Sequence, residues 1–371
     1  MAILPNTQNS THHNLILARM KYEYTKGALG SNETLLKAYI VLMDNPENPI
    51  TINADAPLLA PRTGVNFKFL LNTLLANKNL YENNAYTAIK SPKIYFVSGL
   101  WHNFLVQVGE EKSEVLPFIY ARLPDDIFEQ YEQTYLENLR RFGNPFFTLS
   151  PRIKRTKSTT PQYLHYINNL TDTPTSITFN CTLYLHDGTK NTFQIDTVEG
   201  IIRNEIIGCN VALNKIIDTN NAPEDVARYE IYLTNQAQKQ ITETRVFIVD
   251  DSFAEDTITI LFRNGFGVFE TIEFDGQAVF TDDYTFNTFQ AENELIDYDT
   301  TVVQKLNLKT AALEKDWLKY IAENLMISDE TYWVLPDGRH RRLSKTTKSL
   351  KKFDSRAITE TAELEFRVAK L

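Results

Sequence analysis

Paired acidic residues and adjacent histidines are the side chains of this sequence that could carry out chemistry. Carboxylates stand side by side at Asp250-Asp251 and at Asp282-Asp283. Glycoside hydrolysis needs two acids that converge from different elements, and an acidic β protein offers neighbouring acids by chance. His12-His13 could bind a metal, but no cysteine or acidic residue at ligand spacing accompanies them. Neither pattern predicts an active site.

The segment Arg263-Asn264-Gly265-Phe266-Gly267 resembles a glycine-rich phosphate loop. Such a loop opens a helix whose N-terminal amides bind the anion, whereas this segment lies between two stretches with strand periodicity. No G-x-S-x-G, P-loop or G-x-G-x-x-G motif occurs in the chain. The sequence therefore favours a protein that is not an enzyme, and it indicates no cofactor and no metal. We interpret the remaining histidines as structural side chains: His102, His165, His186 and His340.

One strongly basic run, Gly338–Lys352 (GRHRRLSKTTKSLKK), stands in a chain with a net charge of −9. It is either a solvated loop and strand or a contact for an acidic patch of an adjacent subunit, which would fix the register of an assembly. Nucleic acid is a weaker interpretation, because no aromatic residue is interleaved for base stacking and the chain is acidic overall. The possible subunit-contact residues are Arg339, Arg341, Arg342, Lys345, Lys348, Lys351 and Lys352.

The cysteines and the N-terminus indicate where the chain folds. Cys181 and Cys209 are too few for a disulfide framework, so we expect reduced, buried thiols, with one bridge between them left open. The first residues, MAILPNTQNSTHHNL, lack the basic and apolar regions of a Sec signal. No run of about 18 apolar residues predicts membrane insertion.

Strand periodicity dominates the elements that would position any site. In Tyr229–Asp275, apolar residues alternate with polar ones, which is typical of strands with one buried face. A cleaner alternation, from Ile177 to Leu185, is followed by Asp187-Gly188 as a hairpin turn. Asn264-Gly265 and Asp275-Gly276 predict two further tight turns.

Helical signals are fewer. Apolar spacing predicts a short helix over Phe67–Leu80 and a second over residues 124–142, which begins at Pro124-Asp125-Asp126. Thr310 is expected to cap a helix over Ala311–Met326. Strands are expected at Thr331–Leu335 and Ala362–Val368, with Pro336-Asp337-Gly338 as a turn after the first.

The predicted fold class is therefore mainly β, with tandem β-sandwich domains of the immunoglobulin or fibronectin III kind, a few helices and a C-terminal α+β unit. The expected division is a flexible N-terminal arm (1–14), a β-rich domain (15–149), a linker (150–161), an immunoglobulin-like sandwich (162–285) and a C-terminal α+β domain (286–371).

Several phrases of the chain, from PQYLHYINN through ARYEIYLTNQ, ETRVFIVDD and ILFRNGFGVFETIEFDG to KTTKSLKKFD and AELEFRVAKL, resemble a known class. The chain looks like the virion structural proteins of tailed bacteriophages of Bacteroidetes-type hosts, whose tail or baseplate subunits carry tandem immunoglobulin-like domains. The resemblance covers Pro161–Leu371. It implies a non-enzymatic subunit located in the virion, assembled in the host cytoplasm, whose partners are copies of itself and other virion tail proteins.

Two other functions stay open from sequence. The first is a carbohydrate-binding or adhesin module at a tail tip, which would bind a host surface glycan by stacking an aromatic side chain such as Trp101. A core tryptophan at the end of a strand is the competing interpretation of Trp101. The second is a hydrolase, which would depend on one of the acidic residues.

Overall fold

The structure, a computed structural model, describes most of the chain from residue 146 onward and mainly strands before it. The described residues are 16–17, 23–26, 35–36, 38–42, 50–53, 56–57, 63–66, 94–97, 99–108, 111–112, 116–123, 146–168, 175–217, 222–251, 257–291, 294–350 and 358–369. The predictions for residues 1–14 and for helices over 67–80 and 124–142 lie outside them. The predicted mainly β fold is confirmed.

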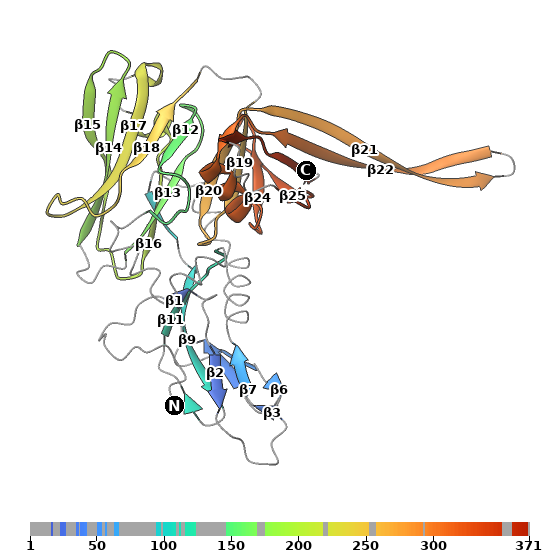
Figure 1. Cartoon of the computed structure of the whole chain (residues 1–371), viewed down its shortest axis with the longest axis horizontal. Helices are drawn as coiled ribbons and strands as arrows, with labels where there is room; N and C mark the ends of the chain where they lie inside the picture. Colours follow the sequence, from blue (N-terminus) through green and yellow to red (C-terminus); the bar gives the residue numbers. More distant parts are fainter. Residues whose placement is uncertain are drawn as a thin grey trace.

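The N-terminal part contains a six-stranded sheet in the order β1-β11-β9-β4-β5, with β10 paired to β9 (Figure 1). Its strands are β1 (Ile16–Leu17), β4 (Ala38–Leu42), β5 (Ile50–Asn53), β9 (Trp101–Val108), β10 (Glu111–Lys112) and β11 (Leu116–Ile119). Two short pairs accompany it: β2 (Glu23–Lys26) with β7 (Thr63–Asn66), and β3 (Leu35–Leu36) with β6 (Ala56–Pro57).

A five-stranded sheet and a three-stranded sheet pack face to face in the middle of the chain. The first has the order β12 (Ile153–Thr156), β18 (Arg245–Val249), β17 (Val226–Asn235), β14 (Ser176–Leu185) and β15 (Lys190–Glu199). The second has the order β13 (Tyr163–Ile167), β16 (Ile206–Asn210) and β8 (Ile94–Val97). Ile177, Phe179, Cys181 and Leu183 are buried between them, as the alternation predicts. Cys181 and Cys209 are both buried and are not joined in a disulfide.

The C-terminal part is a seven-stranded sheet with a core on each side. Its order is β20 (Phe269–Phe274), β19 (Ile258–Arg263), β24 (Thr331–Val334), β25 (His340–Lys345), β27 (Glu363–Val368), β22 (Glu294–Lys309) and β21 (Gln277–Ala291). One side packs under helix α6 (Lys315–Tyr320) and the π-helical turn η2 (Ile321–Leu325). The other side, over β19, β20 and β24, packs against residues from earlier in the chain, such as Tyr95 of β8 and Leu100.

The remaining elements are short. They are α5 (Leu213–Ile216), the 3-10 turn η1 (Pro223–Asp225), and the pair β23 (Leu313–Glu314) with β26 (Thr359–Glu360). No helix among the described residues is long and apolar enough to cross a membrane.

Two predicted domain boundaries differ from the structure. Ile153–Thr156, within the predicted linker, forms β12 and pairs in parallel with Val246–Val249, so residues 150–161 include a strand of a sheet. The boundary at 285/286 falls inside β21, which runs without interruption from Gln277 to Ala291. Tandem immunoglobulin-like sandwiches remain a prediction.

The predicted helix over Ala311–Met326 is shorter than expected. Thr310 does not cap this helix but pairs with Ala362. The Thr310 amide donates to the Ala362 carbonyl at 2.9 Å, and the Ala362 amide donates to the Thr310 hydroxyl at 2.8 Å. The chain then forms β23 before α6 begins at Lys315. Strand pairing with a distant segment thus takes precedence over the local capping signal.

The predicted turns are confirmed in part. Gly188 and Gly338 have φ of +88° and +79° in the turns after β14 and β24. β19 and β20 form a hairpin, but its positive φ lies at Gly267 rather than at Gly265. Asp275-Gly276 joins β20 to β21, which do not pair, so it is not a hairpin turn.

Candidate subunit-docking surface

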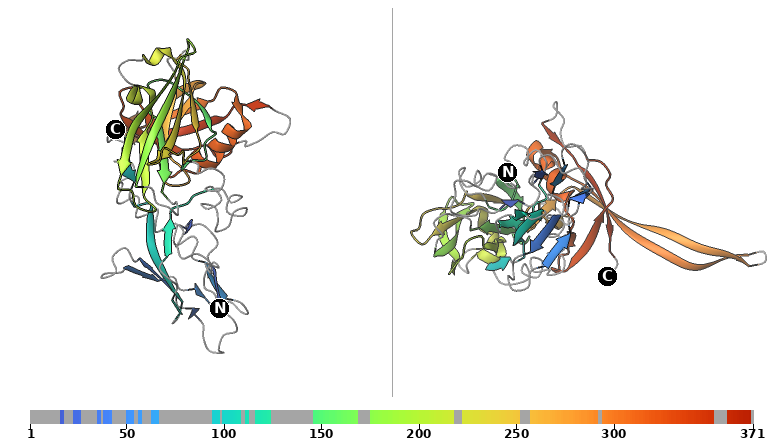
Figure 2. Two further views of the ribbon diagram at one scale, coloured as in Figure 1. Left: turned by 90° about the vertical axis from the view of Figure 1, so that its left-hand side faces the viewer. Right: turned by 90° about the horizontal axis from the view of Figure 1, so that it is seen from below.

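The most exposed feature of the seven-stranded sheet is its last pair of strands. β21 and β22 are 15 and 16 residues long, but β27 pairs with β22 only over Lys305–Lys309. Beyond that point two strands continue alone and extend well clear of the body (Figures 1 and 2). We call residues 281–305 the projecting hairpin. A register shift between Asn287 and Thr288 marks a bulge, which increases the twist of a ribbon.

One side of the projecting hairpin continues the core of the body. Directly paired residues point to the same side of a ribbon. At the root, Phe280 pairs with Leu306, which is fully buried under α6 and η2. Four residues farther along, Tyr284 pairs with Val302, and the period of two places this pair on the same side as Phe280. We call this side the aromatic side.

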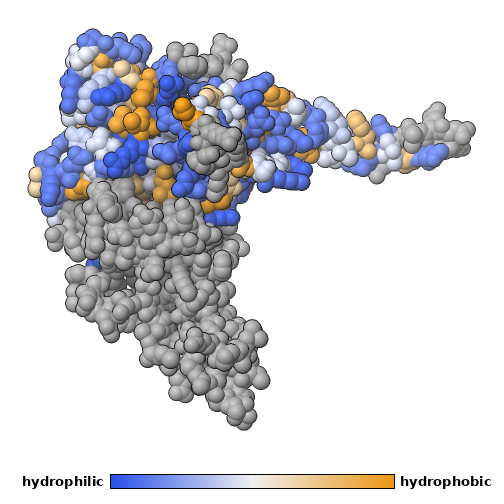
Figure 3. Space-filling view, viewed as in Figure 1, coloured by the Kyte–Doolittle hydropathy of each residue, from blue (hydrophilic) through white to orange (hydrophobic). Residues whose placement is uncertain are grey.

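The aromatic side is exposed from the root at Phe280 to Phe286. Phe280, Tyr284 and Phe286 are 42%, 58% and 57% exposed. The rings of Tyr284 and Phe286 stack with centroids 6.3 Å apart and planes 11° apart. Figure 3 shows apolar residues along the hairpin among hydrophilic ones. Several exposed aromatic side chains on one side of a ribbon are typical of a surface that another protein covers.

The opposite side of the hairpin is polar. Lys305 pairs with Asp283 at 2.7 Å and with Glu365 of β27 at 3.7 Å. Farther out, the Asn287 side-chain amide donates to Asp299 at 3.2 Å. The hairpin is therefore amphipathic, with one side suited to solvent and one suited to a partner.

The hairpin is also strongly acidic. Between residues 281 and 304 the sequence has no lysine or arginine. It has these carboxylates: Asp282, Asp283, Glu292, Glu294, Asp297 and Asp299. Asp282 pairs with Gln304 and lies on the aromatic side, between Phe280 and Tyr284.

A cleft of about 570 Å³ opens at the root of the hairpin. The rings of Trp333 and Phe280 lie against each other in its wall, with centroids 4.9 Å apart and planes tilted by 34°. Its lining is apolar and hydroxyl-bearing with one lysine and no carboxylate: Lys157, Thr159, Thr160, Pro161, Thr257, Ile258, Thr259, Ala278, Phe280, Trp333, Val334, Leu335, Pro336 and Gly338.

The residues of the basic run have different environments. Arg339 is exposed in the turn after β24, where its Nε donates to Asp337 at 2.6 Å. Arg341 pairs with Trp333 in the sheet and donates to Gln304 at 3.2 Å. Arg342 is exposed and donates to the Asp329 carbonyl at 3.3 Å. Arg339 and Arg341 thus flank the cleft at the hairpin root.

Lys345 makes hydrogen bonds within its own chain. Its Nζ donates to the Leu325 carbonyl at 3.2 Å and to the Ser328 carbonyl, at the end of η2. Burial lowers its pKa to about 8. Lys348 is exposed, and Lys351 and Lys352 lie outside the described residues. The five of these basic residues that the structure describes therefore do not form one patch.

A partly buried polar network joins the five-stranded sheet to the seven-stranded sheet. The Thr156 hydroxyl donates to Glu273 at 2.6 Å, and Lys154 donates to Gln162 at 2.6 Å and to the Thr271 carbonyl. Burial raises the pKa of Glu273 and lowers that of Lys154 to about 8, with the nearby carboxylates opposing the second shift. The cavity beside Lys154 measures about 20 Å³, room for about one water molecule and not for a substrate.

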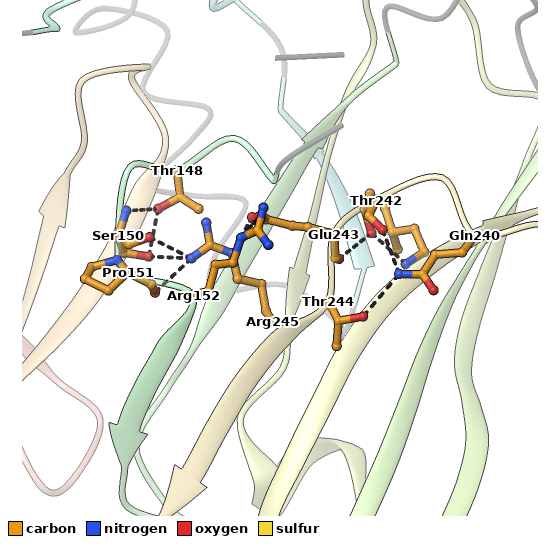
Figure 4. Close-up of polar contacts among 10 residues, drawn as sticks. Thr148, Ser150, Pro151, Arg152, Gln240, Thr242, Glu243, Thr244 and Arg245 are labelled. Carbon is orange, nitrogen blue, oxygen red and sulfur yellow. Dashed lines mark hydrogen bonds and ion pairs between the residues drawn. The ribbon is translucent and has the colours of Figure 1, made fainter. Parts of the chain in front are cut away.

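The start of β12 is fixed by a second polar cluster (Figure 4). Arg245 donates to the carbonyls of Ser150 and Pro151 at 2.7 and 2.9 Å and pairs with Glu243 at 2.8 Å. Arg152 pairs with the same Glu243 at 2.7 Å. These contacts explain why residues that resemble a linker in sequence form an ordered strand.

The other residues singled out for chemistry are separated in space. Asp250 pairs with Arg155 at 4.0 Å, and Asp251 accepts the Ser158 amide at 2.9 Å. His165 is buried against the Tyr95 hydroxyl at 3.0 Å, and burial lowers its pKa to about 3. Trp101 is partly buried against the core beneath the seven-stranded sheet. Within the described part of the chain, no group of three metal-ligating side chains comes together.

Neither the protein-family models nor the curated proteins gave a match to this chain. The projecting hairpin was not found by sequence reasoning. The signal that could have found it is the combination of alternating aromatic residues over 280–286 with the absence of any basic residue over 281–304.

Proposed function

We propose that this protein is a non-enzymatic structural subunit of a larger assembly, namely the tail or baseplate of a tailed bacteriophage. The observation that supports an assembly subunit is the projecting hairpin with its exposed aromatic side. An isolated two-stranded hairpin is at best marginally stable in water, so a ribbon of this length gains its stability from a partner. The assignment to a virion tail rests on the sequence resemblance over Pro161–Leu371.

The polar network between the two sheets supports a structural role. The ionisable groups Lys154 and Glu273, with the buried amide of Gln162, connect the sheets and adjoin space for about one water molecule. A buried and fully connected polar network fixes the arrangement of packed elements. This network therefore accounts for the shifted pKa values of Lys154 and Glu273 through packing, without a reaction.

The test removes the hairpin and keeps the body. Replacing Asp282–Gln304 by Asn-Gly closes the strands after the pair Thr281–Lys305 with a two-residue turn. We expect this variant to fold, to stay monomeric by native mass spectrometry, and to form no rings or tubes in electron micrographs. Asn287→Ala, on the polar side, is the matched control and should assemble like the wild type. Normal assembly of the shortened chain would contradict the proposal.

A further inference from the structure

We propose that the projecting hairpin of one copy docks in the cleft at the hairpin root of the next copy. This inference rests on the proposed function and names the partner of its docking surface, a second copy of this chain. Tyr284 and Phe286 of the incoming hairpin lie against Trp333, Leu335 and Pro336 of the acceptor.

The dimensions and lining of the cleft fit this occupant. Sites of roughly 300–1,000 Å³ enclose ligands the size of a few rings, and the cleft measures about 570 Å³. Its wall already contains one tilted contact between aromatic rings, that of Phe280 with Trp333. Offset or tilted contacts with further rings are favourable beyond the area that they bury.

Charge separates this cleft from others of similar size. The cleft beside Val279, of about 510 Å³, is lined by Glu363, Glu365 and Lys309. The cleft beside Trp317, of about 480 Å³, is lined by three carboxylates and two cations: Glu273, Asp275, Glu314, Lys154 and Arg155. In each of these two linings the carboxylates outnumber the cations by one, which disfavours an acidic hairpin. The cleft at the hairpin root has Lys157 as the one charged residue of its lining, with Arg341 and the ion pair Arg339–Asp337 beside it.

The same charges oppose a symmetric contact between two hairpins. Stacking the aromatic side of one hairpin on that of another would bring together two segments that carry only acidic charge over residues 281–304. Like charges in close contact suppress such an arrangement. The hairpin and the cleft are instead different surfaces with opposite charge, and both are present on every copy. Such a heterologous contact propagates from copy to copy and gives a ring when the rotation closes or a helical tube when it does not.

The experiment uses two variants of the full chain, each of which disables one half of the contact. The donor variant Tyr284→Ser/Phe286→Ser removes the rings of the hairpin. The acceptor variant Lys157→Glu/Arg339→Glu reverses the charge of the cleft. We expect each alone to be monomeric by native mass spectrometry at concentrations at which the wild type assembles.

Mixing the two variants is the decisive measurement. The donor variant keeps an intact cleft, and the acceptor variant keeps an intact hairpin, so a 1:1 mixture should form a heterodimer that grows no further. The control Lys215→Glu/Lys239→Glu carries the same charge change on exposed lysines outside the cleft and should assemble like the wild type. If the double acceptor variant is less stable to heat than the wild type, Arg339→Glu alone, at an exposed turn residue, takes its place.

Each outcome supports or overturns the inference. An acceptor variant that assembles normally, or a mixture that stays monomeric, overturns docking in the cleft and leaves the proposed function in place. A wild-type chain that stays monomeric at every concentration excludes a second copy as the partner. If the donor variant and the shortened chain both assemble normally, the projecting hairpin is not an assembly surface, and the observation that supports the proposed function fails as well.

Discussion

The root and the outer half of the β21–β22 ribbon have the same pattern and opposite surroundings. At the root, Leu306 and Leu308 are buried under α6 and η2. Farther out, Tyr284 and Phe286 continue the same side of the same strands and are exposed. The alternation of apolar and polar residues determines which side of the ribbon is apolar. The length of β27 determines where the ribbon stops being covered by its own chain. An apolar pattern that persists beyond that cover is best explained by cover from another chain.

The largest expected difference between the root and the outer half of the ribbon is in how much a mutation lowers folding stability. Phe366 of β27 is fully buried beside Leu306, so Phe366→Ala should lower the free energy of unfolding by about 3–5 kcal/mol. Phe286→Ala, the same change on the exposed ribbon, should alter it by less than about 0.5 kcal/mol in the monomer. Denaturant titration of both variants measures the difference. Equal losses would mean that the ribbon packs against its own chain.

A second effect concerns Lys154, the buried cation of the body. Burial lowers its pKa from 10.5 to about 8, so the folded chain loses this proton at a lower pH than the unfolded chain. The contribution of Lys154 to stability is therefore constant below about pH 8 and rises from there to about pH 10.5. Relative to Lys154→Met, the wild type should gain on the order of 2 kcal/mol between pH 7.5 and pH 10.

Urea titration at several pH values measures this difference between wild type and variant. The matched control is Lys239→Met, at an exposed turn residue, which should show no such rise. A pH-independent difference between the wild type and Lys154→Met would show that Lys154 is solvated like a surface lysine.

Gly265 tests how closely the body is packed. Its carbonyl accepts the Arg122 amide at 2.6 Å, and a Cβ at this position would lie 2.9 Å from the Arg122 carbonyl oxygen and 2.7 Å from a methyl carbon of Leu123. Gly265→Ala should therefore cost about 1–3 kcal/mol, because backbone must move to admit the methyl group. Thermal unfolding reports the loss. An unchanged midpoint would show that residues 120–123 move away freely.

The smallest free energies are expected in the ribbon itself. Backbone amides of residues 282–290 should exchange with solvent with little protection in the monomer, because the ribbon has two strands and one uncovered side. Amides of β14, in the middle of the five-stranded sheet, should open only with global unfolding. Hydrogen exchange followed by mass spectrometry compares the two segments. Protection of 282–290 that appears only in the assembly would place the cover on another chain.

Sequence reasoning predicted what depends on neighbouring residues. The buried face of β14, from Ile177 to Leu183, follows from a period of two, and the turn at Asp187-Gly188 follows from the ease with which glycine adopts positive φ. Strand β12 could not be predicted in this way, because its order depends on Val246–Val249 and on Arg245, almost a hundred residues away. Thr310 likewise pairs with Ala362 instead of capping a helix.

The candidate site was predicted only in part. The basic run was recognised by composition, but the role of each of its side chains depends on tertiary contacts. Lys345 donates hydrogen bonds to carbonyls at the end of η2, whereas Arg339 stays at the surface. The predicted domain boundary at 285/286 divides the projecting hairpin. It was misplaced because the local apolar pattern does not show which strands pair or how far they extend beyond the rest of the sheet. Its acidic composition was visible in the sequence, but its isolation from the body was not.

The open edge of the ribbon has a consequence for the chain before it assembles. β21 is the last strand of its sheet, and an edge strand with apolar residues is a template for unwanted pairing between newly made copies. Natural proteins reduce this hazard with charged side chains at such edges. The carboxylates of residues 281–304 would keep free chains soluble, because the ribbons of two copies repel each other. This repulsion is overcome only where the ribbon meets a basic acceptor surface.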